Sequence, residues 1–191
     1  MIVALANVAA AAYDLDLVKP AYSKSPYYSD GRIQIVFALR ETSNGRDQEG
    51  IAFTIRNLTN REIEIDWNRS SMWLPTGQMS GVIHEGVRFI QSNTYLPPTV
   101  IPAGRTLSDF VIPTRNITFS VTGWQVRSLN LRSGSQLGLY LFIQGSSLPG
   151  GGYDFALQAA SAAEVSTAET SVNRWWWLLA AVGLVYAKIL L

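Results

Sequence analysis

Apolar and polar residues alternate with a period of two through the middle of this chain. The alternation is clearest in residues 33–40, 51–56 and 62–67, where every second residue is Ile, Leu, Phe or Trp. Successive side chains of a β-strand point to opposite faces, so this period is typical of strands with one buried and one solvated face. These stretches are therefore expected to be strands.

Further strand candidates follow, separated by Gly, Pro, Asn and Ser, and no amphipathic helical stretch of useful length accompanies them. They are residues 82–90, 107–112, 117–121, 124–129, 137–143 and 153–157. Eight or nine short strands in roughly 140 residues indicate an all-β fold, an antiparallel immunoglobulin-like sandwich, with a barrel as the alternative.

Three connections between these strands carry turn or breaker residues. Asn57–Asn60 is expected to form a tight hairpin connection between its neighbours. The prolines of residues 96–104 favour an extended edge or crossover, because proline lacks a ladder donor. The glycines of residues 146–152 predict a flexible connection.

The composition excludes several classes of function. Cysteine is absent, which rules out disulfides, thiolate metal sites, iron–sulfur clusters and a cysteine nucleophile. His84 is the only histidine, so a histidine-rich metal or haem site within this chain is not expected. The net charge of +1, from 15 Lys+Arg against 14 Asp+Glu, argues against nucleic-acid binding, which needs a concentrated basic face.

The end of the chain is apolar enough to predict a transmembrane helix over residues 174–191. Trp175–Leu191 contains one charge, Lys188. As a helix this run would be about 26 Å long, close to the roughly 30 Å of a hydrocarbon core. Tryptophan favours the membrane interface, where a collar is expected from Trp175, Trp176 and Trp177. The alternative is a helix buried in a soluble domain.

The predicted helix also has a face of small residues. Gly183 and Ala187 are four residues apart, a spacing that lets a second helix approach closely, although small residues are common in such helices. One basic residue flanks each end, Arg174 and Lys188, so charge does not set the orientation.

The remaining segments complete the expected domain organisation. Residues 1–13 form an apolar segment, either an export signal or a retained membrane-surface or partner-contacting segment. Residues 14–158 form the β-sandwich domain, and residues 159–173, rich in Ala, Ser and Thr, form a linker.

Residue types used in catalysis and metal binding occur without a supporting motif. A serine triad would draw on Ser70, Ser71, His84, Asp66 and Asp109. The Gly-x-Ser-x-Gly turn is missing, however, and a single histidine on a strand is more often structural. Alternate residues of one strand, Glu62, Glu64 and Asp66, suit either calcium or, more simply, a solvated outer face.

Aromatic residues in or beside loops offer candidate interface positions. They are Tyr22, Tyr27, Tyr28, Trp73 and Tyr95. Aromatic side chains lose few torsions on docking and are frequent interface anchors. The alternative is that the loops pack on their own domain.

Four segments together resemble a known group of proteins. They are residues 65–71, 82–89, 97–104 and 109–114. The chain resembles, over about residues 50–116, poorly characterised bacterial cell-envelope lipoproteins that have a β-sandwich ectodomain. The resemblance implies a domain outside the cytoplasm and brings no catalytic residues. Those relatives carry a lipidated N-terminal cysteine, which this chain lacks, so its C-terminal helix would replace the lipid as anchor.

These observations lead to a functional hypothesis. The chain is expected to be a single-pass, non-enzymatic accessory subunit that stabilises a larger complex of the bacterial inner membrane, with its domain in the periplasm. Photosynthetic reaction-centre–antenna and respiratory assemblies are candidate hosts, and the partners are other integral membrane subunits and the lipid bilayer. No cofactor is expected beyond peripheral lipid or pigment contacts, since the helix has no His to ligate a bacteriochlorophyll magnesium. The alternatives are an independent cell-surface module that binds a protein or a glycan, and a hydrolase using Ser70, Ser71 or His84.

Overall fold

The computed structural model describes residues 13–41, 47–92, 94–145 and 148–161. These residues form strands and two 3₁₀ turns, so the expected all-β class is confirmed. The strands are β1 Tyr13–Lys19, β2 Tyr27–Ser29, β3 Ile33–Glu41, β4 Gln48–Asn57, β5 Ile63–Trp73, β6 Met79–His84, β7 Thr99–Ile101, β8 Thr106–Pro113, β9 Ile117–Ser120, β10 Gly123–Val126, β11 Gln136–Gly145 and β12 Leu148–Ser161. The 3₁₀ turns are η1 Phe89–Gln91 and η2 Thr114–Asn116.

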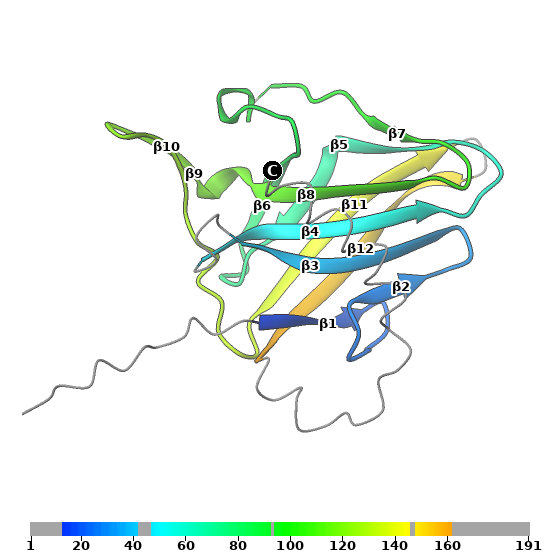
Figure 1. Ribbon diagram of the computed structural model, residues 1–191, viewed down its shortest axis with the longest axis horizontal. Coiled ribbons are helices and arrows are strands. Elements are labelled where there is room, and N and C mark those ends of the chain that lie inside the picture. The colour runs from blue at the N-terminus through cyan, green and yellow to red at the C-terminus, as the bar shows by residue number, and fades with distance from the viewer. Residues whose placement is uncertain (1–12, 42–46, 93, 146–147, 162–191) are drawn as a thin grey trace, which may run out of the picture. The chain divides into compact units, whose positions relative to one another are not determined.

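All strand pairs are antiparallel, and ten strands belong to one sheet that is nearly closed on itself. The order is β1-β12-β11-β5-β6-β8-β4-β3-β2, with β7 added to β5. Figure 1 shows β3, β4 and β8 crossing in front of β11 and β12, so the sheet folds into two layers. The finer prediction of an immunoglobulin-like sandwich is not confirmed by these pairings, because β6 joins the layers through β5 and β8.

The core lies between the two layers and follows the period-two pattern. Ile33, Ile35 and Phe37 of β3 are at most 1% exposed. The ring of Phe37 meets that of Phe155 on β12 edge to face, with centroids 4.9 Å apart. Each large apolar side chain buried in this way contributes about 1.5–3 kcal/mol relative to an exposed one.

The connection between β4 and β5 is not the hairpin that the sequence predicted. β4 pairs with β3 and β8, whereas β5 pairs with β6, β7 and β11, so the chain changes layer here. The side chain of Asn57, which is fully buried, stabilises this change of layer. Its Nδ2 donates to the carbonyl oxygens of Arg61, Ile101 and Pro102 at 2.7–3.2 Å. Turn residues alone do not distinguish a hairpin from such a corner.

The strand predicted over residues 82–90 ends earlier than expected. β6 stops at His84, and Gly86 follows with a φ of +83°, in the left-handed region that glycine adopts without strain. The chain then turns through η1.

The expectation of an extended edge in residues 96–104 is confirmed, since β7 pairs only with β5 among the described strands.

The glycine-rich stretch before Tyr153 is a strand rather than a flexible connection. β12 begins at Leu148, and Gly152 lies opposite Phe142 of β11. A Cβ added at Gly152 would lie 2.0 Å from ring atoms of Tyr140. Glycine is needed at this position because the Tyr140 ring occupies the space of a side chain.

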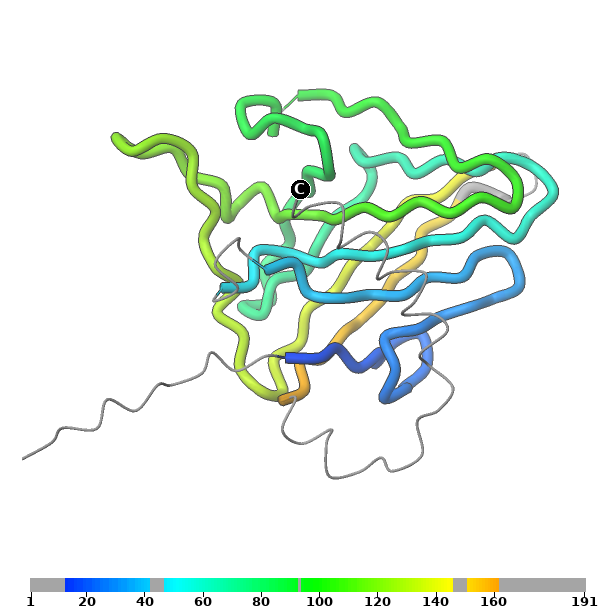
Figure 2. The backbone as a smooth tube through the Cα atoms, in the orientation of Figure 1, coloured from blue at the N-terminus to red at the C-terminus, as the bar shows by residue number. Residues whose placement is uncertain are grey.

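Figure 2 traces the backbone of this β unit from β1 to β12. Among the described residues no helix has the length and apolarity to cross a bilayer. The linker predicted over residues 159–173 begins too early, because residues 159–161 belong to β12 and Ala159 is fully buried. Other predictions fall outside the described residues: those for residues 1–12, for the rest of the linker from residue 162 onward, and for the membrane helix with Trp175, Trp176, Trp177, Gly183 and Ala187.

Candidate functional site

The β9–β10 hairpin forms a small sheet of its own that extends beyond the main sheet (Figure 1). Its turn is residues 121–122, and Gly123 follows with a φ of +106°. At its base, the backbone N–H of Arg127 donates to the Asn116 carbonyl at 2.8 Å, and Asn116 Nδ2 donates to the Arg127 carbonyl at 3.0 Å. The base is therefore held to the body of the β unit, while the tip projects.

The tip of this hairpin is apolar and exposed. Phe119 is 70% exposed, Trp124 43% and Val121 fully exposed. Phe119 and Trp124 are cross-strand partners, with ring centroids 5.1 Å apart. Trp124 also lies 6.4 Å from the ring of Phe89 in η1, beside Ile90, which is 71% exposed. We call Ile90, Phe119, Val121 and Trp124 the hairpin tip surface.

A cavity of about 340 Å³ lies at the base of the hairpin. Apolar side chains from η1, β8 and β10 line it, together with Arg40, Glu49 and His84. The Arg40 guanidinium lies 4.3 Å from the centroid of the Phe110 ring, and its buried Nε has no hydrogen-bond partner. Burial raises the pKa of Glu49, an effect that Arg40 opposes.

His84 borders this cavity and belongs to a buried polar cluster. Its Nδ1 lies 3.2 Å from Asp109 Oδ2, and its ring stacks on Trp67 at 4.2 Å. The other carboxylate oxygen, Asp109 Oδ1, accepts the backbone N–H groups of Glu85 and Phe110 at 2.9 and 2.7 Å. Both oxygens of Asp109 are thus engaged at the junction of β6 and β8, which fixes the geometry of that junction.

The serines considered for a triad do not join this cluster. Ser70 is buried, donates its hydroxyl to the Asp66 carbonyl at 2.7 Å and accepts the N–H of Phe142 at 3.1 Å. Asp66 accepts the N–H of Asn68 at 3.0 Å, an arrangement typical of a local turn. Among the described residues no hydrogen bond links Ser70 or Ser71 to His84.

The acidic residues of β5 do not gather into a metal site. Glu64 accepts a hydrogen bond from Gln144 of the neighbouring β11. Within the part of the chain that the structure describes, no group of three or more His, Asp or Glu residues is placed to hold a metal ion.

A second cavity, of about 420 Å³, lies beside Tyr28 and Tyr153, whose ring centroids are 6.3 Å apart. The Tyr153 hydroxyl donates to Asp30 Oδ2 at 3.0 Å. Burial and this hydrogen bond raise the pKa of Tyr153. Burial raises the pKa of Asp30 as well, but hydrogen bonds from the N–H groups of Ile33 and Arg32 and from Tyr153 lower it overall.

The loop aromatics that the sequence singled out are not brought together as one site. Tyr22 and Tyr95 are 64% and 75% exposed, and Trp73 is 43% exposed on β5. Tyr27 and Tyr28 are partly buried on β2, where Tyr28 packs edge to face on Phe155 at 5.2 Å. Their predicted role at an interface stays a prediction.

Trp73 has an exposed apolar neighbour that sequence reasoning did not select. Met79 lies opposite it across the β5–β6 pair and is 51% exposed. A Cβ added at Gly138 would lie 3.3 Å from Trp73, so the indole side of this strand packs closely on β11. We call Trp73 and Met79 the Trp–Met pair.

Sequence reasoning also missed the hairpin tip surface, because Phe119 and Trp124 were placed in strands of a half-buried sheet. One signal was available: no Asp or Glu occurs from Phe110 to Tyr153, while Arg115 and Arg127 flank the tip.

In comparisons with known proteins, no family model, no curated protein and no solved structure matches this chain.

Proposed function

We propose that this protein is a non-catalytic accessory subunit of a larger bacterial membrane protein complex. In this proposal the predicted helix of residues 174–191 anchors the chain in the inner membrane among the helices of its partners. The β unit lies on the periplasmic side and acts as an immunoglobulin-like domain, a class whose faces and loops commonly bind other proteins. Photosynthetic and respiratory assemblies are candidate hosts.

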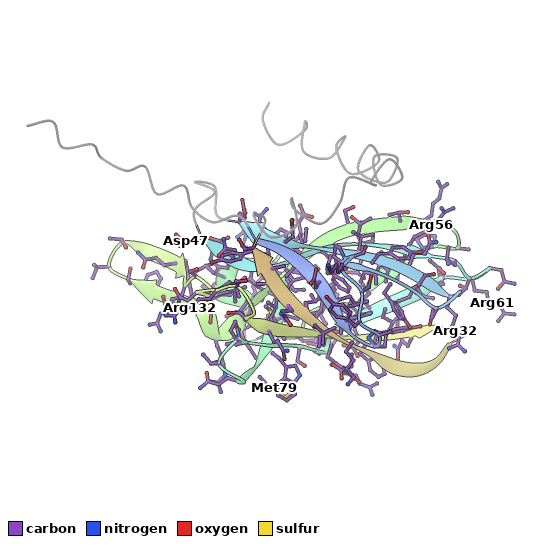
Figure 3. The ribbon with its side chains drawn as sticks, turned by 90° about the horizontal axis from the view of Figure 1, so that it is seen from below. Arg32, Asp47, Arg56, Arg61, Met79 and Arg132 are labelled. Carbon is purple, nitrogen blue, oxygen red and sulfur yellow. The ribbon has the colours of Figure 1, made fainter. Side chains whose placement is uncertain are left out.

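The observation that carries this proposal is the Trp–Met pair. Trp73 and Met79 expose 43% and 51% of their surface at one place on the β unit. Figure 3 shows Met79 pointing out from the lower surface. Tryptophan and methionine are enriched in the cores of protein interfaces, where a few such anchors supply most of the binding energy. The pair is suited to dock on a partner subunit.

The buried polar groups support a binding rather than a catalytic role. Asp109 uses both carboxylate oxygens for His84 and for two backbone N–H groups, and Ser70 uses its hydroxyl for the backbone of β5 and β11. Ser70 thus holds strands together, and neither Ser70 nor Ser71 is hydrogen-bonded to His84, so the His84–Asp109 pair lacks the nucleophile that a serine triad requires.

The test is extraction of the full chain in a mild detergent, followed by size separation. We expect the protein to migrate with a larger complex, and we expect Met79→Gln to shift it toward smaller species. Val100→Gln is the matched control, because Val100 is also on a strand and is 49% exposed. A wild-type chain that runs alone would overturn the proposal. Equal behaviour of both variants would remove the Trp–Met pair from it.

A second candidate is an independent module that binds a glycan, which the cavity beside Tyr28 and Tyr153 favours. Aromatic rings and charged groups converge there: Asp30, Arg32, Lys19 and Asp154 also line the cavity. A few placed polar groups in a concave, partly aromatic site are typical of small-ligand binding. Retention of the full chain on immobilised glycan, reduced by Arg32→Gln but not by Arg56→Gln, would favour this candidate over the first.

A further inference from the structure

The hairpin tip surface exposes more apolar area than any role within the β unit explains. Phe119, Val121 and Trp124 follow one another around the end of a two-stranded hairpin that pairs only with itself among the described strands. An isolated two-stranded hairpin is marginally stable in water, and exposed aromatic side chains there gain from contact with an apolar phase. The base of this hairpin is held to the β unit through Asn116 and Arg127, so it is the exposed tip that is suited to an external apolar surface.

The charges around the tip indicate the nature of that surface. Arg115 and Arg127 stand at the two sides of the hairpin base, and both are exposed. Arg115 Nε donates to the Met79 carbonyl at 3.0 Å, and this hydrogen bond positions the Arg115 side chain. No acidic residue lies in the chain from Phe110 to Tyr153. An apolar tip with a basic base complements an anionic membrane surface, whose phosphates lie just outside the acyl chains.

A lipid surface suits the size of the tip better than a protein does. A stable protein interface uses about 20–30 residues on each side. The hairpin tip surface offers Ile90, Phe119, Val121 and Trp124. Tryptophan and phenylalanine at the end of a narrow projection match the interfacial zone of a bilayer, where aromatic rings are favoured.

We propose that the β9–β10 hairpin is a second membrane contact of this protein. Phe119, Val121 and Trp124 enter the interfacial region of an anionic leaflet, and Arg115 and Arg127 lie against lipid phosphates. This inference rests on the proposed function, because it needs the chain to be anchored at a membrane.

The absence of native cysteine allows a direct test on the full chain. Val121→Cys places one thiol at the tip, for a dye whose emission depends on polarity. Asn60→Cys places the same dye in the exposed turn before β5. Arg61, next to Asn60, is labelled in Figure 3 at the end of the β unit opposite the hairpin of Figure 1. Each variant is reconstituted into phosphatidylcholine vesicles with or without about 30 mol% phosphatidylglycerol, the anionic lipid that the arginines need.

We expect the dye at residue 121 to shift to the blue and to be quenched by nitroxide lipids in anionic vesicles, while the dye at residue 60 stays as in water. Arg115→Gln or Arg127→Gln should each lower the ratio of inserted to free tips about fivefold, since one basic residue at such a surface contributes that factor. Arg56→Gln, an exposed arginine on β4, is the matched control and should change nothing. Salt at about 1 M should weaken insertion by screening.

The outcomes separate this inference from the proposed function. A chain that does not float with vesicles overturns the anchor, and with it the proposed function. A chain that floats with vesicles but keeps the dye at residue 121 in water overturns the hairpin contact alone. A dye that becomes buried only when other membrane subunits are added also overturns it, and assigns the tip to a protein partner.

Discussion

Two regions of the β unit place side chains in opposite surroundings. Around Asp109, polar groups are buried and each carboxylate oxygen has a partner. At the tip of β9–β10, Phe119 and Val121 are apolar and exposed. Burying a polar group costs free energy unless it is hydrogen-bonded, so the first region is explained by the structure itself. The second has no such explanation among the contacts of the described residues. The polar groups around Asp109 thus contribute to structure, and the exposed apolar groups at the tip carry the proposed membrane contact.

The largest expected effect follows from removing the buried carboxylate. Asp109→Ala leaves two backbone N–H groups and His84 without their acceptor, and should lower the free energy of unfolding by about 3 kcal/mol. For a domain of this size the melting temperature should fall by about 6–12 °C. Thermal unfolding of the full chain in detergent, wild type against Asp109→Ala, measures this fall in melting temperature.

The control for this prediction is Asp14→Ala, an exposed aspartate on β1. It should leave the melting temperature nearly unchanged. Equal, small effects of both substitutions would mean that the His84–Asp109 pair is not a structural junction, and the pair would return as a candidate for chemistry.

A smaller effect is expected at Asp30, and it depends on pH. Its carboxylate accepts the N–H groups of Arg32 and Ile33 and the hydroxyl of Tyr153. Although burial raises the pKa of Asp30, these hydrogen bonds lower it overall, below the ordinary 3.8 of the unfolded chain. The stabilisation is therefore present above that pH and is lost as the pH falls through the lowered value.

Asp30→Asn should accordingly reduce stability by about 1 kcal/mol at neutral pH. The difference from wild type should narrow as the pH falls below about 4 and through the lowered pKa of Asp30, because the wild-type carboxyl then becomes neutral like the amide. Melting temperatures measured from pH 7 to pH 3 would test this. A constant gap across that range would show that the carboxylate charge is not the cause.

The pattern of the sequence predicted the class of fold because alternation reports burial directly. Ile33, Ile35 and Phe37 alternate with exposed or partly exposed residues, and their side chains form the core as expected. The pairing of strands was not predictable in the same way. Asn57–Asn60 has turn residues, yet the corner there is set by contacts of Asn57 with Ile101 and Pro102, more than forty residues away.

The candidate site was still less accessible to sequence reasoning. Phe119 and Trp124 alternate with polar residues just as core residues do, so the pattern predicts burial on one face. Their exposure follows from the separation of β9–β10 from the main sheet, which is a property of pairing rather than of composition. Conversely, Tyr28 was selected as a loop aromatic and packs on Phe155. The absence of acidic residues from Phe110 to Tyr153 was visible in the sequence, but it gains meaning only beside the exposed tip.

The smallest effect on stability is expected at the tip, where one substitution sharpens the comparison. Val121→Ser should change the free energy of unfolding by no more than about 0.5 kcal/mol, because Val121 is fully exposed. The same substitution at Val111, which is 0% exposed on β8, should cost about 2–4 kcal/mol through a lost methyl contact and a buried hydroxyl. Melting of both variants measures the contrast between the regions. A Val121→Ser variant as unstable as Val111→Ser would place Val121 against another part of this same chain. The hairpin would then have no need of a membrane, because its apolar surface would already be covered.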